Sequence, residues 1–155
     1  MRKSRSPSPP IPAPGEGKRG EAGYLAYLLR QAAAASRRRL DQALAELDVT
    51  HPQFVVMTMM KAYPDGSNAD LARLALLTPQ TVHAIVDNLE RRGWALKRPD
   101  PRHGRVQILE LTPAGQAVLG RARERAMAEE ARLKGLLDGS EDAVRRWLAA
   151  AARED

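Results

Sequence analysis

Cysteine is absent from this chain of 155 residues, and aromatic residues make up only 4% of it. Without cysteine, the protein can form no disulfide bond and cannot sense oxidants through a thiol. Because the chain has a single phenylalanine among 43% hydrophobic residues, its core must consist of leucine, alanine, valine and methionine. A chain of this length and composition is expected to fold as one aliphatic, mainly helical domain.

Long hydrophobic runs are missing as well. The first residues contain no apolar segment of the kind found in signal peptides, and no later stretch approaches the roughly 18 apolar residues that a membrane-spanning helix needs. We therefore expect a cytoplasmic protein with no membrane partner.

Residue groups typical of enzymes are also lacking. The three histidines, His51, His83 and His103, are isolated from one another, and the chain has no glycine-rich phosphate loop. Catalytic and metal-binding sites need such groups at defined spacings. The sequence therefore predicts neither an enzyme nor a protein that holds a metal or another cofactor.

Positive charge is plentiful but unevenly placed. The net charge of +6 favours a polyanionic partner, yet residues 1–19 carry five basic residues and one acidic residue, so that only +2 remains for the rest. This segment is rich in proline, serine and glycine, and we expect it to be a disordered tail. Two interpretations of it stay open: extra nonspecific affinity for DNA, or a solvated leader. Residues 20–155 form the predicted domain.

The segment from Thr78 to Gly93 has the pattern of a capped helix. Thr78 is a good N-cap, Pro79 suits the first turn, and Gly93 suits the left-handed stop. Four aliphatic residues recur at helical spacing and form one stripe: Val82, Ile85, Val86 and Leu89. The opposite face carries short polar side chains, which is what a helix that reads a DNA groove needs.

A second short helix and a hairpin flank this segment. Ser67 and Asp70 have the spacing of a capping box and begin a helix of about two turns, which meets the 78–93 helix at a tight turn. Downstream, 94–98 and 105–111 are β-capable runs, separated by turn-forming residues. The hairpin tip is basic because Arg98, Arg102 and Arg105 gather there.

The order and spacing of these pieces resemble the MarR family of bacterial transcription regulators, from about Tyr24 to the C-terminus. The motifs that carry the resemblance are V-T-x-x-Q-F at 49–54, L-A at 71–72, T-P-x-T-V at 78–82, V-D-x-L-E at 86–90, R-P-D-P at 98–101 and L-T-P-A-G at 111–115. The resemblance implies a mainly α fold: a winged helix-turn-helix with a two-stranded β-hairpin wing, flanked by N- and C-terminal dimerisation helices. It places the winged helix-turn-helix at 48–112.

Three positions depart from the family's pattern. The wing usually carries D-x-R, but here His103, Gly104 and Arg105 occupy those places, so that the arginine is kept without its acidic neighbour. Ala84 stands where many members have an arginine, and Leu76 stands where the turn often has a glycine. These changes bear on the operator sequence rather than on the fold.

The polar helix face and the basic wing supply candidate DNA contacts. We expect Gln80, Thr81 and His83 to meet base edges in the major groove. The resemblance assigns Arg105 to the minor groove. The remaining candidates for contacts with the DNA backbone are Asn88, Arg91, Arg92, Arg98 and Arg102.

The flanking helices are too long and too apolar to cover only a small winged domain. We expect helices over 21–47, 113–137 and 141–152, within the flanking segments 20–47 and 113–155, and we expect a second copy of the chain to cover their apolar faces. The alternative is a monomer with a plain helical core. A two-fold dimer would place two recognition helices about one DNA turn apart.

The resemblance also implies an effector site between the dimer helices and the DNA-binding lobe. Four residues are candidates for binding a small aromatic or phenolic effector: Tyr24, Tyr27, Arg38 and His51. Packing at the dimer seam or simple solvation is the alternative for each of them.

Together these features predict a homodimeric, sequence-specific transcriptional regulator, a ligand-responsive repressor that binds a palindromic operator in double-stranded DNA. Two other functions are weighed against it: a nonspecific architectural DNA-binding protein, and a winged-helix module that binds other proteins.

Overall fold

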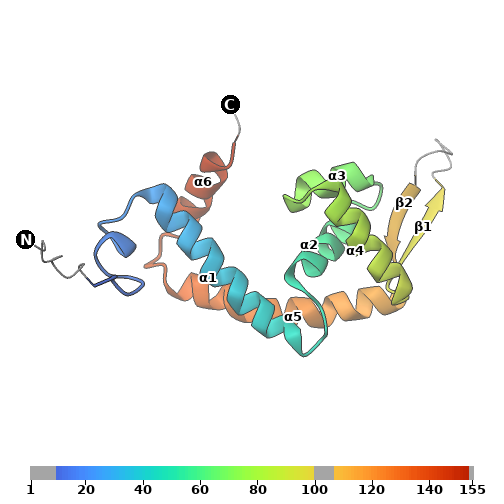
Figure 1. Ribbon diagram of the computed structural model, residues 1–155, viewed down its shortest axis with the longest axis horizontal. Coiled ribbons are helices and arrows are strands. Elements are labelled where there is room, and N and C mark those ends of the chain that lie inside the picture. Colours follow the sequence, from blue (N-terminus) through green and yellow to red (C-terminus); the bar gives the residue numbers. More distant parts are fainter. Residues whose placement is uncertain (1–9, 100–106, 154–155) are drawn as a thin grey trace, which may run out of the picture. The chain divides into compact units, whose positions relative to one another are not determined.

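The computed structural model describes residues 10–99 and 107–153 (Figure 1). The chain separates into two compact units, one up to Arg38 and one from Arg39 onward. Its elements in chain order are η1 Gly17–Arg19, α1 Leu25–Ala45, α2 His51–Ala62, α3 Asn68–Ala75, α4 Pro79–Arg91, β1 Ala95–Pro99, β2 Gln107–Leu111, α5 Pro113–Gly135 and α6 Glu141–Ala151. No helix in the described part of the chain is both long and apolar enough to cross a membrane.

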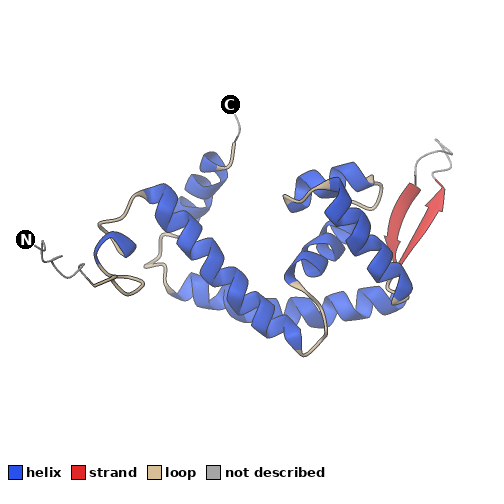
Figure 2. Cartoon of the chain, in the orientation of Figure 1, coloured by secondary structure: helices blue, strands red, loops and turns tan. Residues whose placement is uncertain are grey.

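The core of the second unit forms where α2, α3 and α4 pack together with the β1–β2 hairpin and the start of α5. The largest fully buried side chains of the second unit are aliphatic, as the composition predicts: Leu44, Val56, Met57, Leu71, Val82, Val86, Leu89 and Leu119. Three of them belong to the stripe predicted on α4. Figure 2 shows the two strands beside α4 in this unit.

Four helices begin at a serine or threonine whose hydroxyl accepts a hydrogen bond from the backbone N–H three residues further on. These caps are Thr50, Ser67, Thr78 and Thr112. A cap satisfies one of the N–H groups left without a partner at a helix start and contributes about 1 kcal/mol. The predicted cap at Thr78 and the predicted capping box of Ser67 with Asp70 are confirmed.

The turn between α3 and α4 is closed by a leucine in the left-handed conformation. Leu76 has φ +54° and is 92% exposed. The N–H of the next residue, Leu77, donates to the carbonyl of Ala72 at 2.9 Å. Asn68 Nδ2 also donates to the carbonyl of Pro79 at 3.0 Å, which ties the starts of α3 and α4 together.

The hairpin is antiparallel, with Ala95 opposite Leu111 and Pro99 opposite Gln107. It joins α5 without a loop because Thr112, the residue after β2, caps that helix. A Cβ on Gly115 would lie 1.9 Å from the carbonyl oxygen of Trp94, so only glycine lets α5 start this close to the hairpin. The L-T-P-A-G motif therefore sets the junction between wing and helix.

The first long helix begins later than predicted, at Leu25 rather than near residue 21. Gly20 and Gly23 make turns ahead of it, and the N–H of Gly23 donates to the carbonyl of Gly20 at 2.9 Å. Residues 10–19, expected to belong to a disordered tail, form turns and the short helix η1. Residues 1–9 lie outside the described part of the chain.

We predict that Leu76→Gly stabilises the protein. The left-handed region costs an L-amino acid about 1 to 2 kcal/mol, whereas the extra freedom of glycine in the unfolded chain costs about 0.5 to 1 kcal/mol. Since the leucine side chain is exposed, its removal sacrifices little packing. Urea denaturation should show a free energy of unfolding higher by about 0.5 to 1 kcal/mol.

Leu74→Gly is the matched control, because Leu74 lies within helix α3 and is 38% exposed. There glycine should destabilise the protein by about 1 kcal/mol or more. A loss of stability of equal size in both variants would contradict the interpretation of Leu76.

Candidate nucleic-acid interface

Helix α4 has one buried face and one exposed polar face. Val82, Val86 and Leu89 are each no more than 1% exposed. The residues exposed to solvent on the helix are Pro79, Gln80, Thr81, His83, Ala84 and Arg91. Because the helix is held by its aliphatic stripe, its polar N-terminal end is free to meet a partner. The predicted base-reading residues therefore lie together on one exposed face.

The three predicted base-reading residues differ in how far their side chains are already engaged. Within the described part of the chain, the amide of Gln80 forms no hydrogen bond. The hydroxyl of Thr81 lies 2.8 Å from that of Thr78. The imidazole Nε2 of His83 lies 3.4 Å from a carboxylate oxygen of Asp87. Gln80 is thus the side chain most readily available for a base edge, since an amide can pair bidentately with adenine.

A network of ion pairs joins α4 to strand β1. Lys97 Nζ lies 2.6 Å from Asp87 Oδ1 and 2.8 Å from Glu90 Oε2. The hydrogen bond from Lys97 lowers the pKa of Asp87 below its ordinary value of 3.8, and the same contacts raise the pKa of Lys97. Lys97 therefore fixes the wing to helix α4.

A second ion pair lies within the wing itself. Arg98 Nε donates to Glu110 Oε1 at 2.8 Å. In the register of the hairpin, Arg98 faces Ile108 and Glu110 faces Leu96, so the pair is diagonal across the two strands. The Arg98 guanidinium holds the pKa of Glu110 below its ordinary value. The Arg98 charge is therefore partly neutralised inside the wing.

Arg92 is committed to contacts within the protein. Its guanidinium donates to the carbonyl of Asp48 at 2.6 Å and to the Asp48 carboxylate at 2.9 Å, and it stacks 3.5 Å from the centroid of the Trp94 ring. These contacts bind the end of α4 to the turn between α1 and α2. A phosphate contact by Arg92 stays a prediction, and it would compete with these bonds.

Asn88 is engaged within the protein, as Arg92 is, whereas Arg91 is not. Asn88 Oδ1 accepts a hydrogen bond from Gln53 Nε2 at 2.9 Å, and Gln53 Oε1 in turn accepts one from the backbone N–H of Thr50. Arg91 is exposed and forms no ion pair in the described part of the chain. Of the phosphate-contact candidates on α4, Arg91 is therefore the least engaged. Arg102 and Arg105 lie outside the described residues.

Two of the four predicted effector residues line one cavity. Tyr27 and Arg38 face a cavity of about 260 Å³ within the first unit. Tyr24 does not line it; this residue precedes α1 and is 86% exposed. His51 belongs to the second unit, where it is the first residue of α2 and its backbone N–H donates to Asp41 Oδ1 at 3.3 Å.

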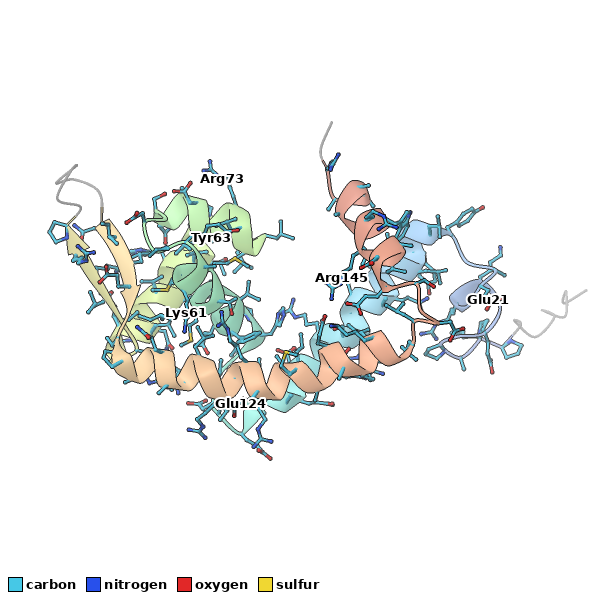
Figure 3. The ribbon with its side chains drawn as sticks, turned by 180° about the vertical axis from the view of Figure 1, so that it is seen from behind. Glu21, Lys61, Tyr63, Arg73, Glu124 and Arg145 are labelled. Carbon is cyan, nitrogen blue, oxygen red and sulfur yellow. The ribbon has the colours of Figure 1, made fainter. Side chains whose placement is uncertain are left out.

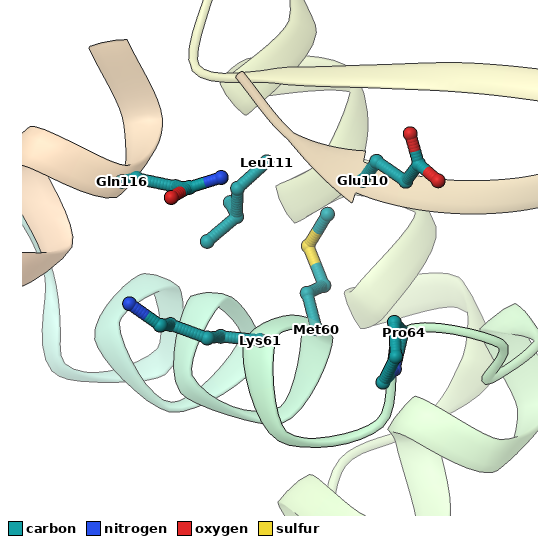
Figure 4. A pocket seen from close by; sticks show the side chains of 6 residues that line it. All are labelled: Met60, Lys61, Pro64, Glu110, Leu111 and Gln116. Carbon is teal, nitrogen blue, oxygen red and sulfur yellow. The ribbon is translucent and has the colours of Figure 1, made fainter. Parts of the chain in front are cut away.

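A separate cavity of about 240 Å³ lies in the second unit between the end of α2, strand β2 and the start of α5 (Figure 4). Six side chains line it: Met60, Lys61, Pro64, Glu110, Leu111 and Gln116. None of the predicted effector residues is among them. Across the described ranges 10–99 and 107–153, no group of three or more His, Asp or Glu side chains could hold a metal ion.

The sequence did not indicate the ion pair between Asp87 and Lys97. It also did not indicate the other residues that line the cavity of Tyr27 and Arg38. Asp87 and Lys97 are ten positions apart, on different elements, so local periodicity could not pair them. The cavity residues on α1 could have been found, because Tyr27, Arg30, Gln31 and Arg38 lie at intervals of three, four and eleven residues from the first of them.

Two short helices, a polar exposed recognition face and an adjoining two-stranded wing define the winged helix-turn-helix class of DNA-binding folds. The model of the MarR family matches residues 47–106. The transcriptional repressor Rv2887 of Mycobacterium tuberculosis is 35% identical over 109 residues, which cover 70% of this chain and 78% of that protein. The chain belongs to the MarR family.

Solved structures agree with this assignment. The transcriptional repressor CouR, bound to a 23-mer DNA duplex, has a TM-score of 0.76 and 30% identity over 84% of this chain and 93% of that one. Rv2887 in complex with salicylic acid has a TM-score of 0.69 and 31% identity over 85% of this chain and 98% of that one.

We predict that Asp87→Asn lowers the stability of the protein near neutral pH and that this difference disappears in acid. The folded-state pKa of Asp87 is depressed, so its ion pair stabilises the fold above the ordinary pKa of 3.8 and is lost as pH falls through the lower folded value. Urea denaturation at several pH values measures the difference between wild type and variant.

Glu124→Gln is the control for this pH series, because Glu124 is exposed on α5 (Figure 3) and has no ion-pair partner within the described residues. Its difference from wild type should stay small throughout. A stability difference for Asp87→Asn that persists at pH values below the depressed folded-state pKa would argue against the ion pair as its source.

We also predict that Arg92→Ala destabilises the fold by about 1 to 2 kcal/mol, because it removes the charged hydrogen bonds to Asp48 and the stacking on Trp94. The neighbouring variant Arg91→Ala should change stability by less than about 0.5 kcal/mol. Thermal and urea denaturation of both variants test the contrast, and similar losses at the two positions would contradict it.

Proposed function

We propose that the protein is a sequence-specific DNA-binding transcriptional repressor that acts as a homodimer on a palindromic operator. The observation that carries the proposal is the exposed, capped start of α4, where the Gln80 amide is unpaired among the described residues and the opposite face is locked into the core. Membership in the MarR family and the similarity to CouR, whose structure contains a DNA duplex, support it.

In the proposed complex, Gln80, Thr81 and His83 meet base edges in the major groove. Arg91 contacts phosphates, and the wing residues Arg98, Arg102 and Arg105 approach the backbone and the minor groove. Asn88 and Arg92 remain candidates for phosphate contacts that would require rearrangement of their present bonds to Gln53 and Asp48. The winged unit at 48–112 thus carries the contacts with DNA.

The flanking helices supply the proposed dimer interface. None of the residues of α6 is buried, although apolar side chains recur along it. Together with the end of α5 it exposes a set of large apolar residues: Met127, Leu133, Leu136, Trp147 and Leu148. The ion pairs Arg145–Glu130 and Lys134–Glu141 hold the two helices in register (Figure 3 labels Arg145). These exposed apolar side chains on two neighbouring helices fit an interface with a second copy related by two-fold symmetry.

The proposed repressor is released from DNA by a small aromatic effector. Rv2887, 35% identical to this chain, has been solved with salicylic acid, which supports a ligand of this class. Binding would favour dimers whose recognition helices stand at the wrong spacing for the two half-sites. The protein then acts in the cytoplasm, where its operator lies. Its action consists of binding DNA and effector and needs no catalysis.

The proposal predicts different effects for Gln80→Ala and Arg91→Gln. Removing the amide should reduce discrimination at one base pair per half-site by about 1 to 3 kcal/mol and leave affinity for random DNA nearly unchanged. Removing the Arg91 charge should weaken operator and random DNA alike, and it should reduce the salt slope by about one for each phosphate that is no longer neutralised.

Both effects can be measured by fluorescence anisotropy with operator and scrambled duplexes at several salt concentrations. Arg121→Gln, which removes an exposed charge on α5 outside the proposed DNA contacts, is the matched control. Equal losses on both duplexes for Gln80→Ala would favour a nonspecific architectural protein, and affinity too weak to measure for the wild type would favour a protein-interaction module.

A further inference from the structure

His83 lies on the solvent-facing stripe of α4 that carries other candidate DNA contacts. Gln80, His83, Asp87 and Arg91 follow one another at intervals of three or four positions, which places them on one side of the helix. The His83 side chain is 65% exposed. The proposed base-reading surface therefore contains an imidazole, a group whose charge changes between about pH 5 and pH 8.

Asp87 lies beside a different basic group with each of its two oxygens. Its Oδ1 is 2.6 Å from Lys97 Nζ, and its Oδ2 is 3.4 Å from His83 Nε2. The contact with His83 becomes an ion pair only when the imidazole is protonated. The hydrogen bond from Lys97 lowers the pKa of Asp87 below its ordinary value of 3.8, so Asp87 keeps its negative charge throughout the range in which an imidazole titrates.

The other charged groups of this cluster balance one another. Lys97, on strand β1, pairs with Glu90 as well as with Asp87. Arg91, one turn beyond Asp87 on α4, adds a second positive charge that acts on Asp87. Two carboxylates and two cations give the cluster a net charge of zero while His83 is neutral. Protonation of His83 then adds one positive charge without a further counter-ion.

The elements packed around His83 bring no additional free carboxylate among the described residues. His83 lines a hollow of about 380 Å³ with residues from the start of α3 and from both strands. Lys97 is charged, and the other described residues of the lining are uncharged: Ser67, Asn68, Ala69, Gln107 and Leu109. Asp70, also at the start of α3, is held by Ser67 and Arg73. Asp87 is therefore the carboxylate that pairs with a protonated His83.

DNA supplies the negative charge that this cluster lacks. A duplex carries one phosphate charge per roughly 1.7 Å of its axis, so a helix in the major groove lies in a negative potential. Such a potential favours the protonated form of an imidazole over the neutral form. With Nε2 beside Asp87, a protonated His83 also presents its Nδ1–H as a donor to an acceptor on DNA. Binding of DNA and uptake of a proton therefore favour each other.

We propose that His83 contacts DNA as an imidazolium braced by Asp87, so that each subunit takes up a proton when it binds its operator. Asp87 acts through His83 in this step and is a positioning residue. The inference rests on the proposed function, which places His83 against DNA, and goes beyond it by naming the charge state of the contact. Because protons are taken up on binding, operator affinity rises as pH falls and levels off once the free protein is already protonated at His83.

The test measures DNA affinity by fluorescence anisotropy between about pH 6 and about pH 8 at constant ionic strength. The probe is a duplex that this protein selects from genomic fragments. Uptake of one proton per subunit should weaken binding by up to about tenfold per subunit for each unit of pH increase. Calorimetry of the same reaction in two buffers with different heats of ionisation counts the protons directly. His83→Gln, which cannot titrate, should remove both the pH dependence and the proton uptake.

Asp87→Asn and Glu90→Gln form a matched pair of variants. Each removes one carboxylate from Lys97, but of the two only Asp87 lies beside His83. Asp87→Asn should lower the number of protons taken up, whereas Glu90→Gln should leave it nearly unchanged. Asp87→Glu restores the carboxylate and should recover part of the uptake. Circular dichroism checks that each variant is folded.

No pH dependence in the wild type, a pH dependence that His83→Gln retains, or equal effects of Asp87→Asn and Glu90→Gln on proton uptake would overturn the inference and leave the proposed function intact. Absence of DNA binding at every pH would overturn both. A scrambled duplex of the same length separates the two kinds of acceptor. Proton uptake confined to the selected duplex supports the inference with a base edge as the acceptor, and equal uptake on both duplexes supports it with a phosphate.

Discussion

Burial of the aliphatic stripe of α4 is the constraint on which the rest of the structure depends. Val82, Val86 and Leu89 insert between α2, α3 and the hairpin and leave almost no exposed surface. Fully burying side chains of this kind stabilises a fold by about 1.5 to 3 kcal/mol each. Rotating α4 about its axis would expose these side chains and remove that stabilisation. The stripe therefore determines which side of the helix faces solvent. The exposed face with Gln80 and His83 is a consequence of the buried one.

In the second unit, the ion pairs mainly position helices and strands relative to one another. Lys97 is bound by Asp87 and Glu90, Arg98 by Glu110, and Arg92 by Asp48 and Trp94. These exposed or partly exposed ion pairs contribute little stability individually, but they set the orientation of wing, helix and turn. Cations held in these ion pairs attract a polyanion less strongly. Fewer positive charges are therefore available to DNA than the number of arginines suggests. In the proposed complex with DNA, Arg91 and the arginines of the wing supply that attraction.

Local signals explain which parts of the fold and site could be predicted. The caps at Ser67 and Thr78, the stripe on α4 and the hairpin all follow from residues a few positions apart, and the structure has each of them. The contact between Arg92 and Asp48 spans 44 positions and depends on how α4 packs, so no spacing rule could indicate it. The start of the first helix was misplaced because the turns at Gly20 and Gly23 interrupt an otherwise helical pattern.

The central claim is that two copies of this chain read a symmetric DNA sequence. Selection of genomic fragments by the purified full-length protein, sequenced after binding at two salt concentrations, tests it most directly. The account predicts recovery of a palindromic motif whose half-sites are about 10 base pairs apart, retained at the higher salt. Uniform recovery that falls steeply with salt, or no recovery at either concentration, would contradict it.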